Sequence, residues 1–484
     1  MPNGDESQVL AVGLACSECF SGPNLAKILQ AGFAYEARVM KQLCNAEAAD
    51  PLSIHTSAGV TDALGDFVQA LAPHVPWKST STTNVSDDWC VSLQLEGASA
   101  VWAAIDMVLQ VQMLTIGNTS RTKVAVGATS YHGPPSTSFG SKMPLWTKEH
   151  QVMYPVPLAG VEKSDDELKA DFAAFLEENG NDVGVILFEP QWGSSQAGLP
   201  WSKDLLRHFI SQAKANGIKV ICDEIMCGLG RHGKGTLFVS EAWGLDPDAV
   251  TFGKAIGGGV YPLSGAILKE GRSLLATNGR TVMQSHTYAG SSVRALMTAT
   301  AVLQEIPRWL PAITKLGEEM EHIFTYLSKI SEGLVICHGQ GLMWGGVFTH
   351  DGQCVDEAYR ASVVSAFKRH CASVGILPYH VPNGGFMVSP VIDVDVGTIY
   401  TMGERLEEAL RRTIAEVQWD PNRVPVHKVS SEASIDMKEL IVRVLGCSSA
   451  EKQQTCLPVF HTTRSCTQCS DFVRFDRRRR FINV

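Results

Sequence analysis

Apolar runs alternate with amphipathic stretches in the central part of the chain, from about Gly97 to Leu303. Runs of strand length predict β-strands at Lys123–Gly127, Val183–Phe188, Lys219–Cys222, Ala249–Phe252 and Gly265–Leu268. The segment Lys203–Asn216 has its apolar residues at helical spacing, which predicts a helix that covers one face of a sheet. This alternation is typical of an α/β fold with a mostly parallel sheet.

The pattern changes after Leu303 and predicts a second, smaller α+β domain. Its expected elements are a helix through Ile330, strands within Leu334–Phe348, a helix at Val355–Val374, strand-like segments around Gly375–Val394, and helices at Thr398–Ala415 and Met437–Val444.

We therefore expect two folded domains, which also suits the length, because single cores stop growing near roughly 250–300 residues. The large domain spans residues 76–310 and has a mostly parallel sheet flanked by helices, and the small domain spans residues 311–446. An N-terminal segment at residues 1–75 would contribute to the small domain and to the active-site wall. Residues 447–484 look like a tail, which we expect to be flexible.

Charge and hydropathy exclude several classes of partner. The net charge of −9 leaves no dominant basic surface, so we expect no nucleic-acid partner. The apolar stretches are shorter than the ~20 residues of a membrane span, and the N-terminus shows no basic region followed by an apolar stretch. The sequence therefore predicts neither a membrane partner nor a secretory signal.

Cysteine usage indicates a reducing compartment. The chain has 13 cysteines, an odd number that favours free thiols over a disulfide framework, so we expect a cytoplasmic protein. Two C-x-x-C pairs, Cys16/Cys19 and Cys466/Cys469, leave a shared zinc site open, although unpaired surface thiols are the favoured explanation.

Two predicted strands end in residues that suit covalent chemistry on an amine. One strand ends in Asp223-Glu224, and the next is followed by Gly253-Lys254 and a glycine run at Gly257–Gly259. Ligands of open parallel sheets bind at the carboxyl ends of the strands. Burial of Lys254 would favour its neutral, nucleophilic amine.

These residues match the needs of pyridoxal 5′-phosphate (PLP), which requires a lysine amine, an acid at the pyridine nitrogen and an anion pocket. Lys254 and Asp223 supply the first two. The stretch Leu95–Ala100 enters a helix, and the free N–H groups at that helix start would hold the phosphate, although a glycine helix cap explains the glycine equally well. Tyr131-His132 follows another strand and offers a platform for stacking on the ring.

A competing motif lies at Gly228–Gly233, where the chain matches the G-x-G-x-x-G dinucleotide fingerprint. In that fingerprint the third glycine leads into a helix. Here Lys234-Gly235-Thr236 continues a loop, so we reject a dinucleotide site.

Taken together, the motifs from about residue 90 to 350 resemble those of the class III (ornithine/omega-type) aminotransferases, which are fold-type I PLP-dependent enzymes. The matching stretches are Phe188-Glu189-Pro190, Asp223-Glu224-Ile225, Gly228–Gly233, Phe252–Ala255, Tyr261–Ser264 and Ser285–Gly290.

The resemblance implies a homodimer with its active site at the subunit interface. It implies that Lys254 forms the Schiff base, that Asp223 pairs with the pyridine nitrogen, and that Tyr131 stacks on the ring with His132 beside it. Gly97 and Ala98 would hold the phosphate, and Met226 would take the position of a cofactor-contacting glutamine. Thr287 would reach the phosphate of the neighbouring subunit. A strand-end hydroxyl is the structural alternative for Thr287.

The chain also departs from the family pattern. Glu96 brings a carboxylate to the expected phosphate site, and Phe386–Pro390 lacks the arginine that clamps an α-carboxylate in many members. Ser194 replaces the partner glutamate of that arginine, so we expect poor use of glutamate. Trp192 and Trp77 are candidates for the substrate wall, although tryptophans in such positions are more often core residues.

The sequence thus predicts a transaminase that exchanges an amino group between a small-molecule amine or amino acid and an oxo acid. Another PLP-dependent outcome, such as an aminomutase, racemase, decarboxylase or lyase reaction, remains open, because the bond that breaks depends on geometry. A scaffold that kept the fold and lost the chemistry is disfavoured, because both Lys254 and Asp223 are retained.

Overall fold

A computed structural model describes residues 20–54, 60–77, 89–116, 120–133, 150–269, 287–288, 290, 292–350, 353–354, 357–381 and 384–417. All of them belong to one unit, residues 1–428, which is held together by its internal contacts. The second unit, residues 429–484, lies outside the described residues, as do the predicted helix at Met437–Val444, the predicted tail and both C-x-x-C pairs.

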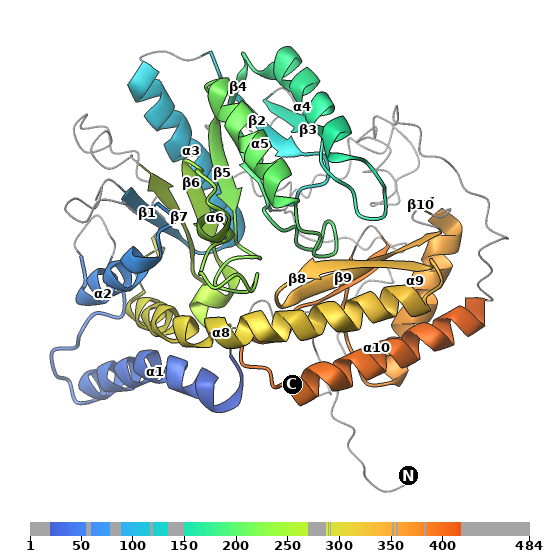
Figure 1. The fold of residues 1–484 in the computed structure, drawn as a ribbon. Helices are drawn as coiled ribbons and strands as arrows, with labels where there is room; N and C mark the ends of the chain where they lie inside the picture. Colours follow the sequence, from blue (N-terminus) through green and yellow to red (C-terminus); the bar gives the residue numbers. More distant parts are fainter. Residues whose placement is uncertain are drawn as a thin grey trace, which may run out of the picture. The chain divides into compact units, whose positions relative to one another are not determined.

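The larger sheet of the described region has seven strands (Figure 1). In spatial order they are β1 (Trp89–Gln94), β7 (Ser264–Lys269), β6 (Ala249–Phe252), β5 (Lys219–Asp223), β4 (Val183–Phe188), β2 (Lys123–Gly127) and β3 (Gln151–Tyr154). The strands from β6 to β3 pair in parallel, whereas β7 is antiparallel to both neighbours. The prediction of a mostly parallel sheet is confirmed.

β7 runs against its neighbour because its connection from β6 is short. Residues 253–263 contain a 3₁₀ turn, η4 (Lys254–Gly257), in place of a crossover helix. A parallel return needs a connection of about a dozen residues or more, usually helical. This short connection keeps Lys254 directly at the end of β6.

Helices cover both faces of this sheet. On one face, α3 (Gly97–Ile116) packs its apolar side chains against Val185 and Leu187 of β4 and against residues of β2, β5 and β7. On the other face lie α4 (Asp165–Asn179) and α5 (Lys203–Ala215). The apolar residues that give α5 its helical spacing are all buried, namely Leu205, Leu206, Phe209, Ile210 and Ala213. A strand that is buried on both faces, such as β4, reads as a continuous apolar run.

The smaller sheet is antiparallel throughout and has five strands within the described residues. They are β8 (Val335–Gln340), β9 (Met343–His350), β10 (Gln353–Cys354), β11 (Tyr379–Val381) and β12 (Gly385–Val388), accompanied by α9 (Glu357–Ser373) and α10 (Val396–Val417). The predicted α+β region is confirmed.

The long helix α8 (Val293–Ile330) connects the two sheets (Figure 1). It begins ten residues before the predicted start at Leu303 and passes through Pro307 and Pro311 without a break. The predicted division between residues 310 and 311 therefore falls inside a continuous helix. Against α8 pack α1 (Gly22–Cys44) and α2 (Asp62–Leu71), and the short elements η2 (Ala72–His74) and α6 (Val239–Trp243) complete the described structure.

No described helix combines the length and the apolar character that crossing a membrane requires. Within the described ranges, no three histidine, cysteine or carboxylate side chains gather as a metal site would require.

Candidate active site

A cavity of about 230 Å³ lies where β2, β4, β5 and β6 end and α3 begins. It is lined by Glu96, Gly97, Ala98, Tyr131, His132, Gly133, Glu189, Gln191, Gly193, Ser194, Asp223, Ile225, Met226 and Lys254. Every site residue predicted from the sequence lies on this wall except Thr287. The structure thus brings an amine, carboxylates and a helix start together at one edge of the sheet.

Asp223 is held at the end of β5 by several hydrogen bonds. One carboxylate oxygen accepts hydrogen bonds from the N–H of Ile225 at 3.2 Å and from the Thr251 hydroxyl at 2.9 Å. Thr251 is available because the parallel register pairs it with Asp223. The side chain is only 5% exposed, so the direction in which it faces is fixed by the protein.

His132 contacts the second oxygen of Asp223, with a Nδ1–Oδ2 distance of 2.7 Å. Burial lowers the pKa of His132, but the hydrogen bond and the negative charge of Asp223 outweigh it, so that the pKa is raised overall. The buried Nε2 atom has no hydrogen-bond partner among the described residues. The imidazole therefore fixes Asp223 through one nitrogen, and its other nitrogen is buried without a partner in the described part of the chain.

Glu189 lies behind this pair, immediately after β4, and the sequence analysis assigned it no role. Its carboxylate accepts hydrogen bonds from the N–H groups of Tyr131 at 3.0 Å and Gly193 at 3.5 Å. Burial raises its pKa to about 7, a rise that the charge of His132 opposes and that of Asp223 reinforces. The sequence feature that could have identified Glu189 as a site residue is its position directly after a fully apolar strand.

Lys254 differs from the prediction in one respect, because its side chain is exposed. The expected burial of the amine is wrong, since Lys254 starts the 3₁₀ turn at the cavity wall. Its backbone has a φ of +48°, in the left-handed region that non-glycine residues rarely adopt. Among the described residues, no polar group pairs with the amine.

The start of α3 forms another part of the cavity wall. Its first-turn N–H groups have no partners within the helix, and they carry the positive end of the helix dipole. A Cβ atom at Gly97 would lie 2.9 Å from Cδ1 of Ile225, so a larger residue here would require the end of the Ile225 side chain to shift. Because Gly97 has no side chain, the backbone at this helix start leaves room for close approach of a ligand.

Three further predicted residues need a separate account. Tyr131 lines the cavity and is 56% exposed, and Met226 packs so closely that a Cβ atom at Gly193 would lie 2.4 Å from its sulfur. Thr287 is exposed and does not line this cavity. Their roles toward a cofactor stay predictions.

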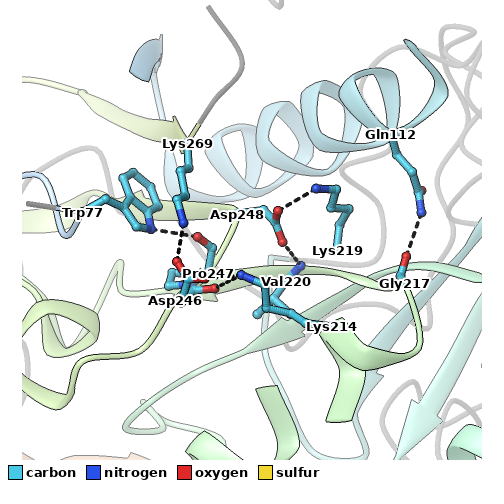
Figure 2. Close-up of polar contacts among 10 residues, drawn as sticks. All are labelled: Trp77, Gln112, Lys214, Gly217, Lys219, Val220, Asp246, Pro247, Asp248 and Lys269. Atoms are coloured by element: carbon cyan, nitrogen blue, oxygen red, sulfur yellow. Dashed lines mark hydrogen bonds and ion pairs between the residues drawn. The ribbon is translucent and has the colours of Figure 1, made fainter. Parts of the chain in front are cut away.

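Neither tryptophan suggested for the substrate wall lines the cavity. Trp192 is fully buried and stacks on Trp201, with ring centroids 4.9 Å apart. Trp77 donates a hydrogen bond to the carbonyl of Pro247 at the opposite edge of the sheet (Figure 2). Both have structural roles in this chain.

The rejected dinucleotide motif forms a loop of turns, and the next helix, α6, begins only at Val239. The buried Glu224 accepts hydrogen bonds from the N–H groups of Val239 and Ser240 at that helix start. Burial raises its pKa to about 7, although these bonds oppose the rise. Glu224 therefore stabilises the loop, and its neighbour Asp223 faces the cavity.

Comparison with known proteins identifies the family. The model of the family "Aminotransferase class-III" matches residues 36–378. The chain belongs to the class III aminotransferases. The family predicted from the sequence is therefore confirmed.

Curated class III aminotransferases align over parts of the chain. The 5-aminovalerate aminotransferase DavT of Pseudomonas putida is 32% identical over 191 residues, which cover 39% of this chain and 42% of DavT. The acetylornithine aminotransferase of Bacillus anthracis is 32% identical over 187 residues, covering 37% of this chain and 45% of that enzyme. The chain thus spans less than half the length of these curated relatives.

Solved structures of transaminases share the fold over most of the chain. An omega-transferase from Vibrio fluvialis JS17 is 18% identical with a TM-score of 0.68, covering 85% of this chain and all of the other. A PMP-bound aminotransferase from Vibrio fluvialis gives a TM-score of 0.67 at 18% identity, covering 82% and 86%. The predicted fold-type I architecture is confirmed.

Proposed function

We propose that this protein is a PLP-dependent aminotransferase that moves an amino group from an amine or amino acid to an oxo acid. The family membership supports this function. The observation that carries it is that Lys254, Asp223 and the start of α3 all line one cavity. An amine, an acid and an anion-binding helix start are the groups that such a cofactor needs.

The residues present fit PLP. The N–H groups of Gly97 and Ala98 would hold the phosphate, Asp223 would face the pyridine nitrogen, and Tyr131 would lie against the ring. His132 would keep Asp223 in place, and its partnerless buried Nε2 is a further polar atom at the site. When bound, PLP supplies an electron sink for the carbon that carries the amino group.

Lys254 would carry the covalent attachment and the proton transfers. Its exposed amine is held by no ion pair in the described part of the chain, so it can reach both a cofactor and a substrate. Once released, the same amine would take the proton from the substrate carbon that bears the amino group, as a general base. One residue would thereby serve in binding and in acid–base catalysis.

The site suggests substrates other than glutamate. The described part of the cavity wall contains no arginine, and Ser194 stands where the family often has a glutamate. Met387, within the stretch that lacks the clamp, is buried in β12. We therefore propose that amines or ω-amino acids are preferred as donors.

An aminomutase reaction is the second candidate. A glutamate-1-semialdehyde 2,1-aminomutase from Thermus thermophilus is 32% identical over 148 residues, covering 30% of this chain and 34% of that enzyme. Met226 lies on the cavity wall, and by the family resemblance the aminomutases tend to have methionine at this position. Product analysis with and without an oxo-acid acceptor separates the two, because an aminomutase needs no external acceptor.

We also propose a homodimer in the cytoplasm, with Thr287 reaching the neighbouring site. Thr287 is exposed beside Tyr288, which borders a hollow of about 300 Å³ with Leu95 and Tyr261. If sites are shared, mixing subunits that carry Lys254→Ala with subunits that carry Thr287→Ala should restore activity through one intact site per mixed dimer. If sites are not shared, the mixture should only average the two variants.

The function is tested on purified protein incubated with PLP. We expect an absorption band that borohydride removes and a pyridoxyl mass added to the peptide that contains Lys254. A panel of amines and ω-amino acids should transfer nitrogen to pyruvate, 2-oxoglutarate or glyoxylate. Lys254→Ala should lose the band, the mass and the activity, whereas Lys203→Ala at the start of α5 should keep all three. Retained activity in Lys254→Ala would refute the assignment.

A further inference from the structure

Glu96 lines the cavity and has no role in the proposed reaction. The cavity also contains Glu189 and Asp223, which are buried and accept hydrogen bonds from neighbouring N–H or hydroxyl groups. The side chain of Glu96 is exposed, and its carboxylate makes no hydrogen bond or ion pair with the described residues. Its charge is therefore not neutralised within this part of the protein.

The backbone fixes Glu96 beside the expected phosphate site. The Ser99 hydroxyl donates to the carbonyl of Glu96 at 2.9 Å and accepts from its N–H at 3.4 Å. The N–H of Ala100 also donates to that carbonyl, at 3.1 Å. Glu96 thus stands one residue before α3, next to Gly97 and Ala98, and all three residues line the same cavity.

The electrostatics of this arrangement oppose a second anion. The start of α3 attracts negative charge, but Glu96 already brings one negative charge there. A phosphate monoester carries about −1.5 to −2 charges near neutral pH. In the described part of the wall, Lys254 is the one lysine and there is no arginine to offset the repulsion.

We propose that Glu96 lowers the affinity for the phosphate group of the cofactor, so that the protein exchanges its cofactor with solution instead of retaining it permanently. This inference rests on the proposed function, because it concerns the hold on PLP. Glu96 then acts on binding of the phosphate and not on the groups that react. The chemistry of Lys254 and Asp223 would be unaffected once the cofactor is bound.

The test compares cofactor affinity in four proteins: the unaltered protein, Glu96→Gln, Glu96→Asp and Glu178→Gln. Glu178 is an exposed carboxylate on α4, so its variant removes the same charge at a position outside the cavity. Dissociation constants are measured by absorbance and fluorescence titration with PLP and, separately, with pyridoxal, which lacks the phosphate. Each titration is made at low and at high salt.

We expect Glu96→Gln to bind PLP about tenfold more tightly at low salt, as repulsion between close charges at a partly exposed site predicts. The gain should shrink at high salt, because ions screen exposed charges. Glu96→Asp, which keeps the charge, and Glu178→Gln should resemble the unaltered protein. Pyridoxal should bind equally well to all four proteins.

Unchanged or weaker binding of PLP to Glu96→Gln would overturn the inference and leave the proposed function standing, provided that the band removed by borohydride still forms. An equal gain with pyridoxal would also overturn it, because the effect would not involve the phosphate. If none of the four proteins binds PLP or forms the band, the proposed function itself fails, and the inference fails with it.

Discussion

At the amino ends of β5 and β6, each charged side chain has a partner (Figure 2). Asp246 pairs with Lys214 and Lys269, and Asp248 pairs with Lys219 at 2.8 Å. Asp248 also accepts a hydrogen bond at 2.9 Å from the N–H of Val220. These ion pairs and hydrogen bonds lie where β5 and β6 begin.

At the carboxyl ends of the same strands, fewer of the charged and polar side chains have hydrogen-bond or ion-pair partners among the described residues. Lys254 and the carboxylate of Glu96 have no partners within the described residues, and His132 keeps one buried nitrogen without a hydrogen bond. Burial raises the pKa of Glu189. The two edges differ because one contributes to the stability of the sheet, whereas the other, we propose, keeps its groups for ligands.

The test with the largest expected effect replaces one aspartate at each of these two edges of the sheet and compares the turnover rates. Asp223→Asn should lower the turnover rate by about 10² to 10⁴-fold, the range typical of groups that stabilise charge or move protons at the reacting centre. Asp248→Asn should leave turnover unchanged, because that residue lies at the opposite edge. Steady-state kinetics with saturating PLP measures both, and equal losses in the two variants would remove the proposed distinction.

Unlike turnover, the free energy of unfolding should depend on Asp248. Asp248→Ala removes an ion pair and leaves the N–H of the buried Val220 without its acceptor, so the free energy of unfolding should fall by about 2 kcal/mol. Asp182→Ala is the control, because its side chain is 56% exposed and it should cost less than about 0.5 kcal/mol. Urea denaturation measures both, and similar losses would contradict the expectation.

The two edges should also respond to pH in opposite ways. Burial raises the pKa of Glu189 from 4.5 to about 7, so the folded protein binds this proton more tightly than the unfolded chain does. The stability that comes from this proton is complete below pH 4.5 and is lost as the pH rises to about 7. Glu189→Gln should flatten that part of the stability curve.

Asp246 should show the reverse behaviour. Burial favours its protonated form, but the hydrogen bonds and charges of Lys214 and Lys269 outweigh burial and lower its pKa below 3.8. Its contribution is present above pH 3.8 and is lost as the pH falls through the lowered pKa. Asp246→Asn should flatten only this acid limb, which denaturation across a pH series can detect.

The smallest predicted effect concerns the backbone of Lys254. Its φ of +48° is unfavourable for any residue with a Cβ atom, and glycine removes that cost. Lys254→Gly should therefore be more stable than Lys254→Ala by about 1 kcal/mol, although both lack activity. Thermal unfolding without added cofactor measures the difference, and equal stability would show that the turn is not strained.

The strands that position the site were predictable to within a residue. Val183–Phe188 and Ala249–Phe252 coincide with β4 and β6, because strands that are buried on both faces consist mainly of apolar residues. β1 and β3 were missed, since most of their residues are only partly buried and their pattern is mixed. The start of α8 was misplaced, because its first residues pack against elements distant in sequence.

The site was predictable in composition and not in its contacts. Asp223 and Lys254 could be chosen because each follows an apolar strand, and such strand ends share an edge of the sheet. The bond between His132 and Asp223 joins residues 91 positions apart, and the exposure of Lys254 depends on the turn that follows β6. The raised pKa of Glu189 depends on its burial and on the nearby charges of His132 and Asp223, which only the folded structure brings together.

The sequence by itself determined the family pattern, the parallel strands and the residues capable of the chemistry, because these depend on local apolar runs and on residue types. Only the tertiary structure decided which charges are neutralised and which remain available. Charge neutralisation depends on distances of a few ångströms between segments far apart in the chain. The folded sheet sets these distances, pairing the aspartates at one edge and leaving Lys254 and Glu96 without partners among the described residues at the other.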